Sequence, residues 1–259
     1  MESFSESSLP EQDCVKLIAE VSGAIVPDDS ALHPWYTAFS TAQARRLAHD
    51  LALIQKYVPV NASVLEIGSV PLILTAALTR RGYAKLQGVD IDPSRFLSAI
   101  KRFSLTVHAC DIENQSLPFE NDQFEAIIFN ELFEHLRMNP IATFREVHRV
   151  LRPDGLLLLS TPNLRSLKRI INFIVHNHTG PALKNPPGIY EEYIKLEEIH
   201  HMGHARVYTS QEVIQFLERM GFRIEAIIYR GSFQGRIERL IIKCLPGLKP
   251  FFTLIARKK

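Results

Sequence analysis

Along the chain, short continuous runs of apolar residues alternate with segments in which apolar residues recur at helical spacing. In residues 37–57, Ala44, Leu47, Leu51 and Ile54 fall on one face of a helix, so an amphipathic helix is predicted there. Further helices are predicted at PSRFLSAIKRF (93–103), ELFEHLRM (131–138), IATFREVHRVL (141–151) and TSQEVIQFLERMGF (209–222). Strands are predicted at ASVLEI (62–67), KLQGVDI (85–91), SLTVHAC (104–110), EAIIFN (125–130), RPDGLLLLSTPN (152–163), RIEAIIY (223–229) and FFTLIA (251–256).

This alternation of strands and helices predicts the fold class. Strand–helix–strand units with right-handed crossovers build an open sheet with helices on both faces. We therefore predict an α/β fold with a doubly wound, mostly parallel sheet. Residues 1–60 are predicted to form a helical segment over the site, and residues 61–259 the sheet domain. The alternation lapses at about residues 165–205, which we interpret as an insertion over the edge of the site, and the first ten residues are expected to fray.

Composition and charge narrow the function classes. The net charge of +2 disfavours nucleic acid as a partner, because nucleic-acid-binding domains usually have a strongly basic face. Residues 230–259 nevertheless carry eight basic residues and one acid, which gives +7 there and −5 elsewhere. This basic segment either touches an anionic membrane surface or packs on the sheet with solvated charges, and we favour the second interpretation. Three scattered cysteines and the lack of a signal-peptide pattern favour a soluble, cytoplasmic protein.

Polar side chains follow four of the predicted parallel strands, where ligands bind in sheets of this kind. The first strand ends at Glu66, Gly68 and Ser69, and the next two end at Asp90 and Asp111. An acid at the second position is suited to ribose hydroxyls and one at the third to an adenine amino group. Each acid alone is as well explained by a solvated loop or a helix cap. Together with Asn130 and Glu131 after the fourth strand, they favour a nucleoside-binding edge.

A second group of candidate residues is ELFEH, directly after the fourth strand. Glu131, Glu134 and His135 stand at i, i+3 and i+4, which places them on one face of a helix. Two carboxylates and an imidazole there are able to bind a divalent metal, with Mg²⁺ or Mn²⁺ favoured by oxygen-rich ligation. The alternative is an exposed face of Glu and His without a metal. The nearby cluster HHMGH supplies His200, His201 and His204 as ligands, substrate contacts or solvated loop residues.

From about residue 64 to residue 228 the chain resembles the class I S-adenosylmethionine-dependent methyltransferases. The matching blocks, in order, are VLEIG, GVDIDP, CDIENQSLPFENDQFEAIIFNELFEHL, HRVLRPDGLLLLSTPN and HARVYTSQEVIQFLERMGFRIE. The resemblance implies seven strands, the last antiparallel, and methyl transfer as the activity. It places Glu66 and Gly68 at the methionine part of the cofactor, Asp90 at the ribose, and Asp111 with Ile112 at the adenine. The predicted cofactor-binding set is Glu66, Gly68, Ser69, Asp90, Ile91, Asp111, Ile112 and Asn130.

The chain departs from the family pattern in the first loop, where Val70 and Leu72 stand at positions that are often glycine. A dinucleotide loop needs several glycines because a pyrophosphate must approach the backbone closely. S-adenosylmethionine has no phosphate and carries a sulfonium cation, so one sharp turn at Gly68 and a nearby acid suffice. The missing glycines therefore count against NAD more than against S-adenosylmethionine.

The ELFEH block resembles the ExxEH metal site of ubiquinone-pathway O-methyltransferases and of small-RNA 2′-O-methyltransferases. That resemblance implies a metal held by Glu131, Glu134, His135 and His204, since GHARVYT places His204 at the position of a later ligand. In family members without a metal, Glu131 would line the cofactor and His135 would orient the substrate or act as the base. His135 is the predicted catalytic residue, and the alternative is that the metal itself activates the acceptor.

The sequence thus predicts S-adenosylmethionine-dependent methyl transfer to a small-molecule acceptor, most readily at oxygen, with Mg²⁺ or Mn²⁺ as a further candidate cofactor. One alternative is an RNA 2′-O-ribose methyltransferase that uses the same Glu/Glu/His/His metal site. Another is a cofactor-binding domain without catalysis.

Overall fold

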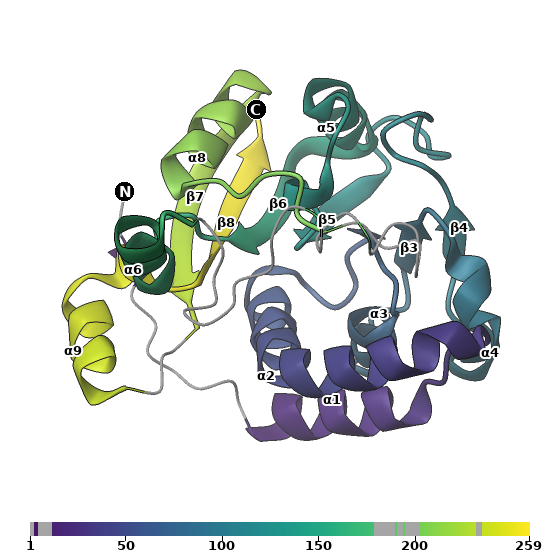
Figure 1. Ribbon diagram of the computed structural model, residues 1–259. Helices are drawn as coiled ribbons and strands as arrows, with labels where there is room; N and C mark the ends of the chain where they lie inside the picture. Colours follow the sequence, from purple (N-terminus) through teal and green to yellow (C-terminus); the bar gives the residue numbers. More distant parts are fainter. Residues whose placement is uncertain (1–2, 5–11, 179–189, 191–193, 195–202, 232–234) are drawn as a thin grey trace.

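The computed structural model describes residues 3–4, 12–178, 190, 194, 203–231 and 235–259, which form a sheet between layers of helices (Figure 1). The strands are β1 (Ser3–Phe4), β2 (Val64–Ile67), β3 (Leu86–Asp90), β4 (Val107–Ala109), β5 (Phe124–Asn130), β6 (Leu151–Pro162), β7 (Phe222–Arg230) and β8 (Phe251–Lys258). The helices are α1 (Gln12–Ala24), α2 (His33–Tyr57), α3 (Ile73–Arg80), α4 (Leu97–Phe103), α5 (Pro140–Val150), α6 (Leu167–His176), α8 (Ser210–Arg219) and α9 (Arg236–Cys244). Short 3₁₀ helices span Ser30–Leu32, Pro93–Phe96, Phe133–His135 and Pro246–Leu248.

The strand order is β1-β7-β8-β6-β5-β2-β3-β4. Strand β2 lies at the centre of the parallel part, with Leu65 opposite Gln87 of β3 and Ile127 of β5. Strand β8 runs antiparallel to both β6 and β7. The predicted doubly wound, mostly parallel sheet of seven strands, the last antiparallel, is therefore confirmed.

The first strand of the chain adds an eighth, two-residue edge. Ser3 and Phe4 pair in parallel with Ile227 and Ile228 of β7. The expectation that the first ten residues fray is wrong for these two residues, because the free edge of β7 offers them backbone partners.

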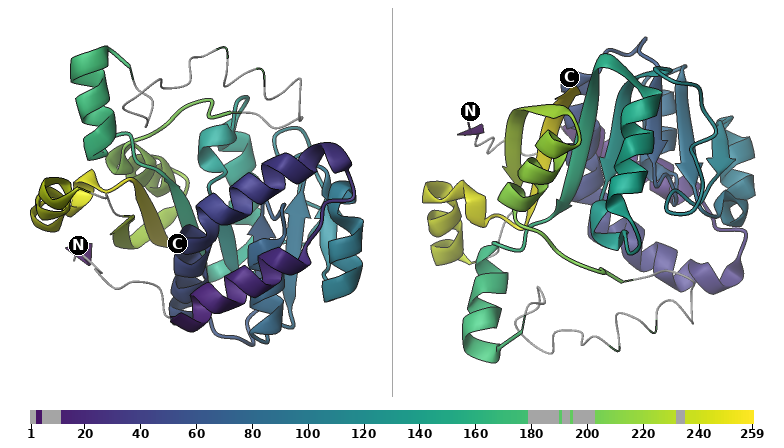
Figure 2. Two further views of the ribbon diagram at one scale, coloured as in Figure 1. Left: turned by 60° about the horizontal axis from the view of Figure 1, so that its bottom comes forward. Right: turned by 90° about the horizontal axis from the view of Figure 1, so that it is seen from above.

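Side chains of each inner strand point alternately to the two faces of the sheet, and each face has its own core. From β5, Ala126 and Ile128 join the core beneath α1, α2, α3 and α4, whereas Ile127 and Phe129 join the core beneath α5 and α8. The views in Figure 2 show these helices covering opposite faces. Burial of an Ile or Phe side chain contributes about 1.5–3 kcal/mol, so strands covered on both faces read as continuous apolar runs.

The predicted helix 131–138 is not formed. Only Phe133–His135 makes a single 3₁₀ turn, because Glu131 adopts φ +50° and Leu136 is already extended. The next helix, α5, begins at Pro140 and is capped by Asn139, whose side chain accepts from Ala142 N at 3.1 Å. The ELFEH residues are therefore carried by a loop with one tight turn, and they do not share one face of a helix.

The N-terminal helices pack together on one face of the sheet. Helix α2 begins at His33, four residues earlier than predicted, with Pro34 in its first turn, where proline is tolerated. Helices α1, α2 and α3 contact one another. In the part of the chain that the structure describes, no helix has both the length and the apolar character needed to cross a membrane.

Candidate functional site

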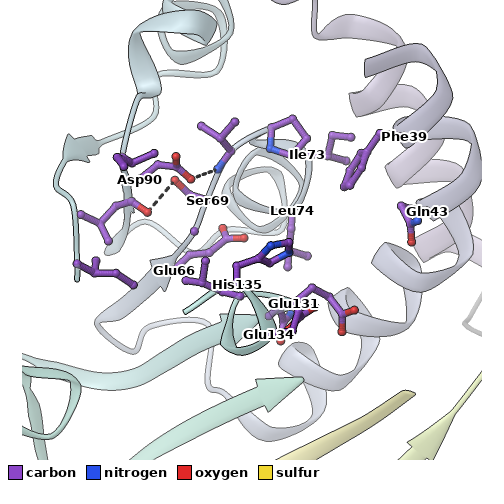
Figure 3. A pocket seen from close by; sticks show the side chains of 18 of the residues that line it. Phe39, Gln43, Glu66, Ser69, Ile73, Leu74, Asp90, Glu131, Glu134 and His135 are labelled. Carbon is purple, nitrogen blue, oxygen red and sulfur yellow. Dashed lines mark hydrogen bonds between the residues drawn. The ribbon is translucent and has the colours of Figure 1, made fainter. Parts of the chain in front are cut away.

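A cavity of about 760 Å³ opens at the carboxyl ends of β2, β3 and β5, between the sheet edge and α2 (Figure 3). It is lined by every residue of the predicted cofactor set: Glu66, Gly68, Ser69, Asp90, Ile91, Asp111, Ile112 and Asn130. These residues come from four separate strand ends, which the parallel topology brings to one edge. The structure thus brings the whole predicted set together at one cavity, and the role of each residue in it stays a prediction.

The loop after β2 turns sharply at Gly68, which has φ +76°. The N–H groups of Gly68 and Ser69 both donate to Val89 O, at 2.9 and 3.2 Å. A Cβ at residue 68 would lie 3.0 Å from the Leu132 side chain, so glycine is needed here for both conformation and space. Leu72 takes a second left-handed conformation, φ +68°, at one of the positions where the resembled family often has glycine. The loop therefore keeps a tight path without the additional glycines.

Asp90 fixes this loop against the next strand. Its carboxylate accepts from Val70 N at 2.9 Å, and Val70 and Pro71 both line the cavity. Burial raises the pKa of Asp90 to about 6, although hydrogen bonds from Val70 and Asp92 oppose that rise. A ligand hydroxyl that donates to Asp90 would favour its charged form.

Glu66 lies deeper at the same strand end and is buried. Its carboxyl group accepts a hydrogen bond from Thr75 Oγ1 at 2.7 Å. Burial raises the pKa of Glu66 to about 8, and the nearby acids Asp50 and Asp90 act in the same direction. At neutral pH this group is therefore mostly protonated until a cation comes close to it.

The adenine end of the predicted cofactor site has a different character. Asp111 is held within its own turn, where its carboxylate accepts from Glu113 N at 3.0 Å and Asn114 Nδ2 at 2.7 Å. Ile91 is largely exposed, and Ile112 is half-buried against the core beneath α5. Apolar side chains beside an acid suit a flat heterocycle with an amino group.

Three of the four predicted metal ligands meet at the other end of the cavity. Glu134, His135 and His204 each offer a ligand atom, and these atoms lie within 4.8 Å of one another. The turn carrying Glu134 also holds the loop that carries His204, because Glu134 O accepts from Ala205 N at 2.8 Å. His200 and His201 lie outside the described residues. Sequence separation of some 70 residues is thus bridged by backbone hydrogen bonds.

Glu134 is oriented for a ligand role. Its Oε2 accepts from Thr161 Oγ1 at 2.8 Å, while Oε1 is buried, has no hydrogen-bond partner among the described residues and lies 3.9 Å from His204 Nε2. Burial raises the pKa of Glu134 to about 8, with repulsion from Glu131 as the next cause. A buried carboxyl oxygen close to two imidazoles fits a cation, since an unpaired buried polar atom is otherwise costly.

Glu131, the fourth predicted ligand, lies outside this group of ligand atoms. Its Oε1 accepts from Arg230 Nη2 at 3.2 Å, and its Oε2 lies 3.6 Å from Arg46 Nη1. Arg230 is buried and also pairs with buried Asp50 of α2 at 2.8 Å. Because residue 131 adopts a left-handed conformation, Glu131 does not share a helical face with Glu134 and His135, and it pairs with Arg46 and Arg230 instead. The expectation of one helical ligand face is therefore corrected.

Comparison with known proteins gives the family. A family model described as a methyltransferase domain matches residues 39–227. The chain belongs to this methyltransferase family. Its fold is that of solved S-adenosylmethionine-dependent methyltransferases: one from Archaeoglobus fulgidus superposes with a TM-score of 0.57 at 16% identity, covering 86% of this chain and 100% of the other. The family implies S-adenosylmethionine as the cofactor.

Curated relatives of the methyltransferase match over shorter stretches. An uncharacterized protein of Methanocaldococcus jannaschii is 27% identical over 147 residues, which is 55% of this chain and 57% of the relative. A ubiquinone biosynthesis O-methyltransferase of Neisseria meningitidis is 26% identical over 43% of this chain and 48% of the relative. A ribosomal protein L11 methyltransferase of Desulforapulum autotrophicum is 28% identical over 48% of this chain and 41% of the relative. The chain thus spans about half the length of these relatives.

The wall that α2 gives to the methyltransferase cavity was largely missed from the sequence. Trp35, Phe39, Gln43 and Arg46 line the cavity, and Figure 3 shows Phe39 and Gln43 projecting into it from α2. Their spacing of three or four residues is the helical signal that could have revealed this second face. Tyr36, next to Trp35 on α2, is buried, and its hydroxyl donates to Ser22 O at 2.8 Å.

Proposed function

We propose that the protein transfers the methyl group of S-adenosylmethionine to a hydroxyl oxygen of a small molecule. Family membership and the cavity at the strand ends support the cofactor. The single observation that carries the acceptor chemistry is the meeting of Glu134, His135 and His204 in the same cavity. Ligand atoms of this kind activate a hydroxyl group, whereas an amine needs no comparable help to become a nucleophile.

The cofactor would lie along the strand ends in the order that the resemblance implies. Asp90 would accept from the ribose hydroxyls, and Asp111 with Ile112 would frame the adenine. Glu66 would lie near the positively charged methionine end, where an approaching cation lowers the pKa of its carboxyl group. The sulfonium is a strong electrophile already, so the main task of these residues is alignment at roughly 3–3.5 Å between the reacting atoms.

A divalent metal fits the Glu134, His135 and His204 group. With two imidazoles and one carboxylate, this donor set suits Mn²⁺ better than Mg²⁺, which prefers oxygen ligands. When bound, such an ion would lower the pKa of an acceptor hydroxyl. Glu131 would join it only by giving up part of its pairing with Arg46 and Arg230.

The reaction would be an in-line displacement. The acceptor oxygen forms a bond to the methyl carbon while the carbon–sulfur bond breaks, and S-adenosylhomocysteine leaves with the electron pair on sulfur. The hydroxyl proton passes to His135 or to solvent. Trp35 and Phe39, whose ring centroids are 5.2 Å apart on α2, would exclude water and contact an apolar part of the acceptor.

The test combines cofactor binding with metal dependence. Calorimetry should detect S-adenosylmethionine binding to the purified protein, and failure to bind would contradict the proposal at its root. Methyl transfer should then be measured with tritiated cofactor on a panel of hydroxylated small molecules, a small RNA and a ribosomal protein. Loss of turnover with a chelator and its return with Mn²⁺ would support the metal. Labelling of RNA or protein alone would overturn the small-molecule acceptor.

A further inference from the structure

Helix α6 has its polar and apolar sides reversed relative to an ordinary surface helix. The residues it buries are Arg169 and Asn172, whereas Phe173, Ile174 and Val175 are 60%, 75% and 65% exposed. Soluble amphipathic helices bury their apolar stripe and expose their charges. Single exposed apolar residues are common on proteins, but three consecutive large ones on one helix end are not.

Helix α9 presents the same kind of surface beside it. Leu240 and Leu245 are 64% and 56% exposed, and Arg239 and Lys243 are exposed around them. Ile242 is buried and anchors the helix to the body of the protein. The apolar residues of α9 are therefore displayed on a helix whose position is fixed.

The two helices lie at the same end of the molecule, where all three views in Figures 1 and 2 place them close to each other. Asn163, just before α6, links the start of α6 to the segment that follows α9. Its Nδ2 donates to Gly247 O at 2.9 Å and to Lys249 O at 2.8 Å, just after α9. We call the exposed residues Phe173, Ile174, Val175, Leu240 and Leu245, with their basic neighbours, the α6–α9 face.

Charge identifies the partner that this face fits. Around these apolar residues, Arg165, Arg239 and Lys243 are exposed and Lys168 is half-buried, against one acid, Glu238. Arg169 and Lys249, in the same two segments, are buried and do not contribute to the surface. These five side chains give the face a net charge of +3, while the whole chain carries only +2. Apolar side chains with basic residues around them fit the headgroup boundary of an anionic membrane.

We propose that the α6–α9 face docks on the surface of an anionic phospholipid bilayer. Phe173, Ile174, Val175, Leu240 and Leu245 enter the boundary between headgroups and acyl chains, and the basic residues contact the lipid phosphates. Helix α6 follows Pro162 and α9 precedes Phe251, and both of these residues line the cavity. Docking therefore sets the acceptor end of the cavity near the bilayer, where a lipid-soluble acceptor would enter. That last step depends on the proposed function, but the docking does not.

The chain carries its own position for a reporter. Cys244, at the end of α9, is exposed, whereas Cys14 and Cys110 are buried. An environment-sensitive fluorophore on Cys244 should shift to the blue when the protein meets vesicles of phosphatidylcholine with 30% phosphatidylserine. Phosphatidylcholine alone should give a much smaller shift. Sedimentation of the unlabelled protein with the same vesicles provides an independent binding constant.

Matched variants test which surface binds. Phe173→Ser with Ile174→Ser should weaken vesicle binding at least tenfold, and so should Arg239→Ser with Lys243→Ser. The control, Val26→Ser with Val60→Ser, removes two apolar side chains that are 58% and 49% exposed away from α6 and α9, and should leave binding unchanged. Circular dichroism should be the same for all of them.

Three outcomes would overturn the docking. The first is no binding to either vesicle, and the second is equal loss of binding in the Val26 and Val60 control. The third is a protein dimer that Phe173→Ser with Ile174→Ser dissociates, which would assign the face to a second copy of the chain. S-adenosylmethionine binding is measured separately, so failure of the proposed function and failure of docking are distinguishable.

Discussion

The two ends of the cavity are built in different ways. At the proposed cofactor end, Glu66, Asp90 and Asp111 lie at the ends of parallel strands, and hydrogen bonds to groups no more than 20 residues away in the sequence hold them in place. At the proposed acceptor end, Glu134 is held by Thr161 and by a loop that comes some 70 residues later in the sequence. The cofactor end therefore follows from sheet topology, whereas the acceptor end depends on contacts between distant parts of the chain.

This difference suggests that the strand-end part of the cavity is common to the family, whereas the part around Glu134 is particular to this protein. The strand ends are a property of the doubly wound fold, and the same arrangement can bind one cofactor in many enzymes. The acceptor end draws on α2, the β5 loop, the segment near His204 and the start of β8. Substitutions at the two ends should consequently change different measurable quantities.

The largest expected effect is on turnover at the acceptor end. Glu134→Gln keeps the size of the side chain but removes the carboxyl group that would hold a cation beside His204, so methyl transfer should fall by about 10²–10⁴-fold. The affinity for S-adenosylmethionine, measured by calorimetry, should change less than about threefold because the contact lies at the other end. The control is Glu218→Gln, which changes an exposed glutamate of α8 that does not line the cavity. If Glu134→Gln reduced the affinity for S-adenosylmethionine as much as it reduced methyl transfer, the two ends of the cavity would not be functionally separate.

The next effect is on stability, through the ion pairs beneath the acceptor end. Arg230→Met leaves Asp50 buried without its 2.8 Å partner, and removal of one member of a buried pair costs about 3–5 kcal/mol. Urea denaturation should show this loss. The double variant Arg230→Met with Asp50→Leu should recover most of it, because neither charge is then buried alone. Equal stability of the single and double variants would show that the pair is not the cause.

The third effect is on cofactor affinity. Asp90→Ala removes a charged acceptor from the predicted ribose position and also the tie to Val70 N, and hydrogen bonds to charged groups contribute about 1.5–3 kcal/mol each. The Kd for S-adenosylmethionine should therefore rise by about 10–150-fold, since 1.4 kcal/mol is a factor of ten. Asp92→Asn, which changes the more exposed neighbour, is the control. Unchanged affinity in Asp90→Ala would show that the ribose binds elsewhere in the cavity.

The same difference between the two ends of the cavity explains which features could be predicted from the sequence. Apolar runs and strand ends are local patterns, so the strands of the sheet could be predicted, and so could the meeting of the eight predicted residues at one cavity. Leu72 shows the limit even there, because the left-handed conformation of a leucine has no signal in a single sequence. Only the tertiary structure fixes that path.

The acceptor end was predicted less well for two physical reasons. Helical spacing suggested one face for Glu131 and Glu134, but φ +50° at residue 131 turned Glu131 to Arg230, whose position 99 residues later no local pattern reveals. The cavity-facing side of α2 was missed because its core-facing side, with Leu47, Leu51 and Ile54, dominates the apolar pattern. Ion pairs between residues far apart in the sequence therefore cannot be predicted from the periodicity of apolar residues.

The smallest effect is a proton at the cofactor end. Burial raises the pKa of Glu66 to about 8, so folding favours its protonated form, and stability should fall as the pH rises from the unfolded value of 4.5 towards 8. An S-adenosylmethionine cation beside Glu66 would lower that pKa again, so binding at pH 7 should release up to one proton. Calorimetry in two buffers of different ionisation enthalpy measures the number released, and Glu66→Gln should bring it close to zero. Uptake of a proton, or release that persists in Glu66→Gln, would mean that the methionine end lies against another group.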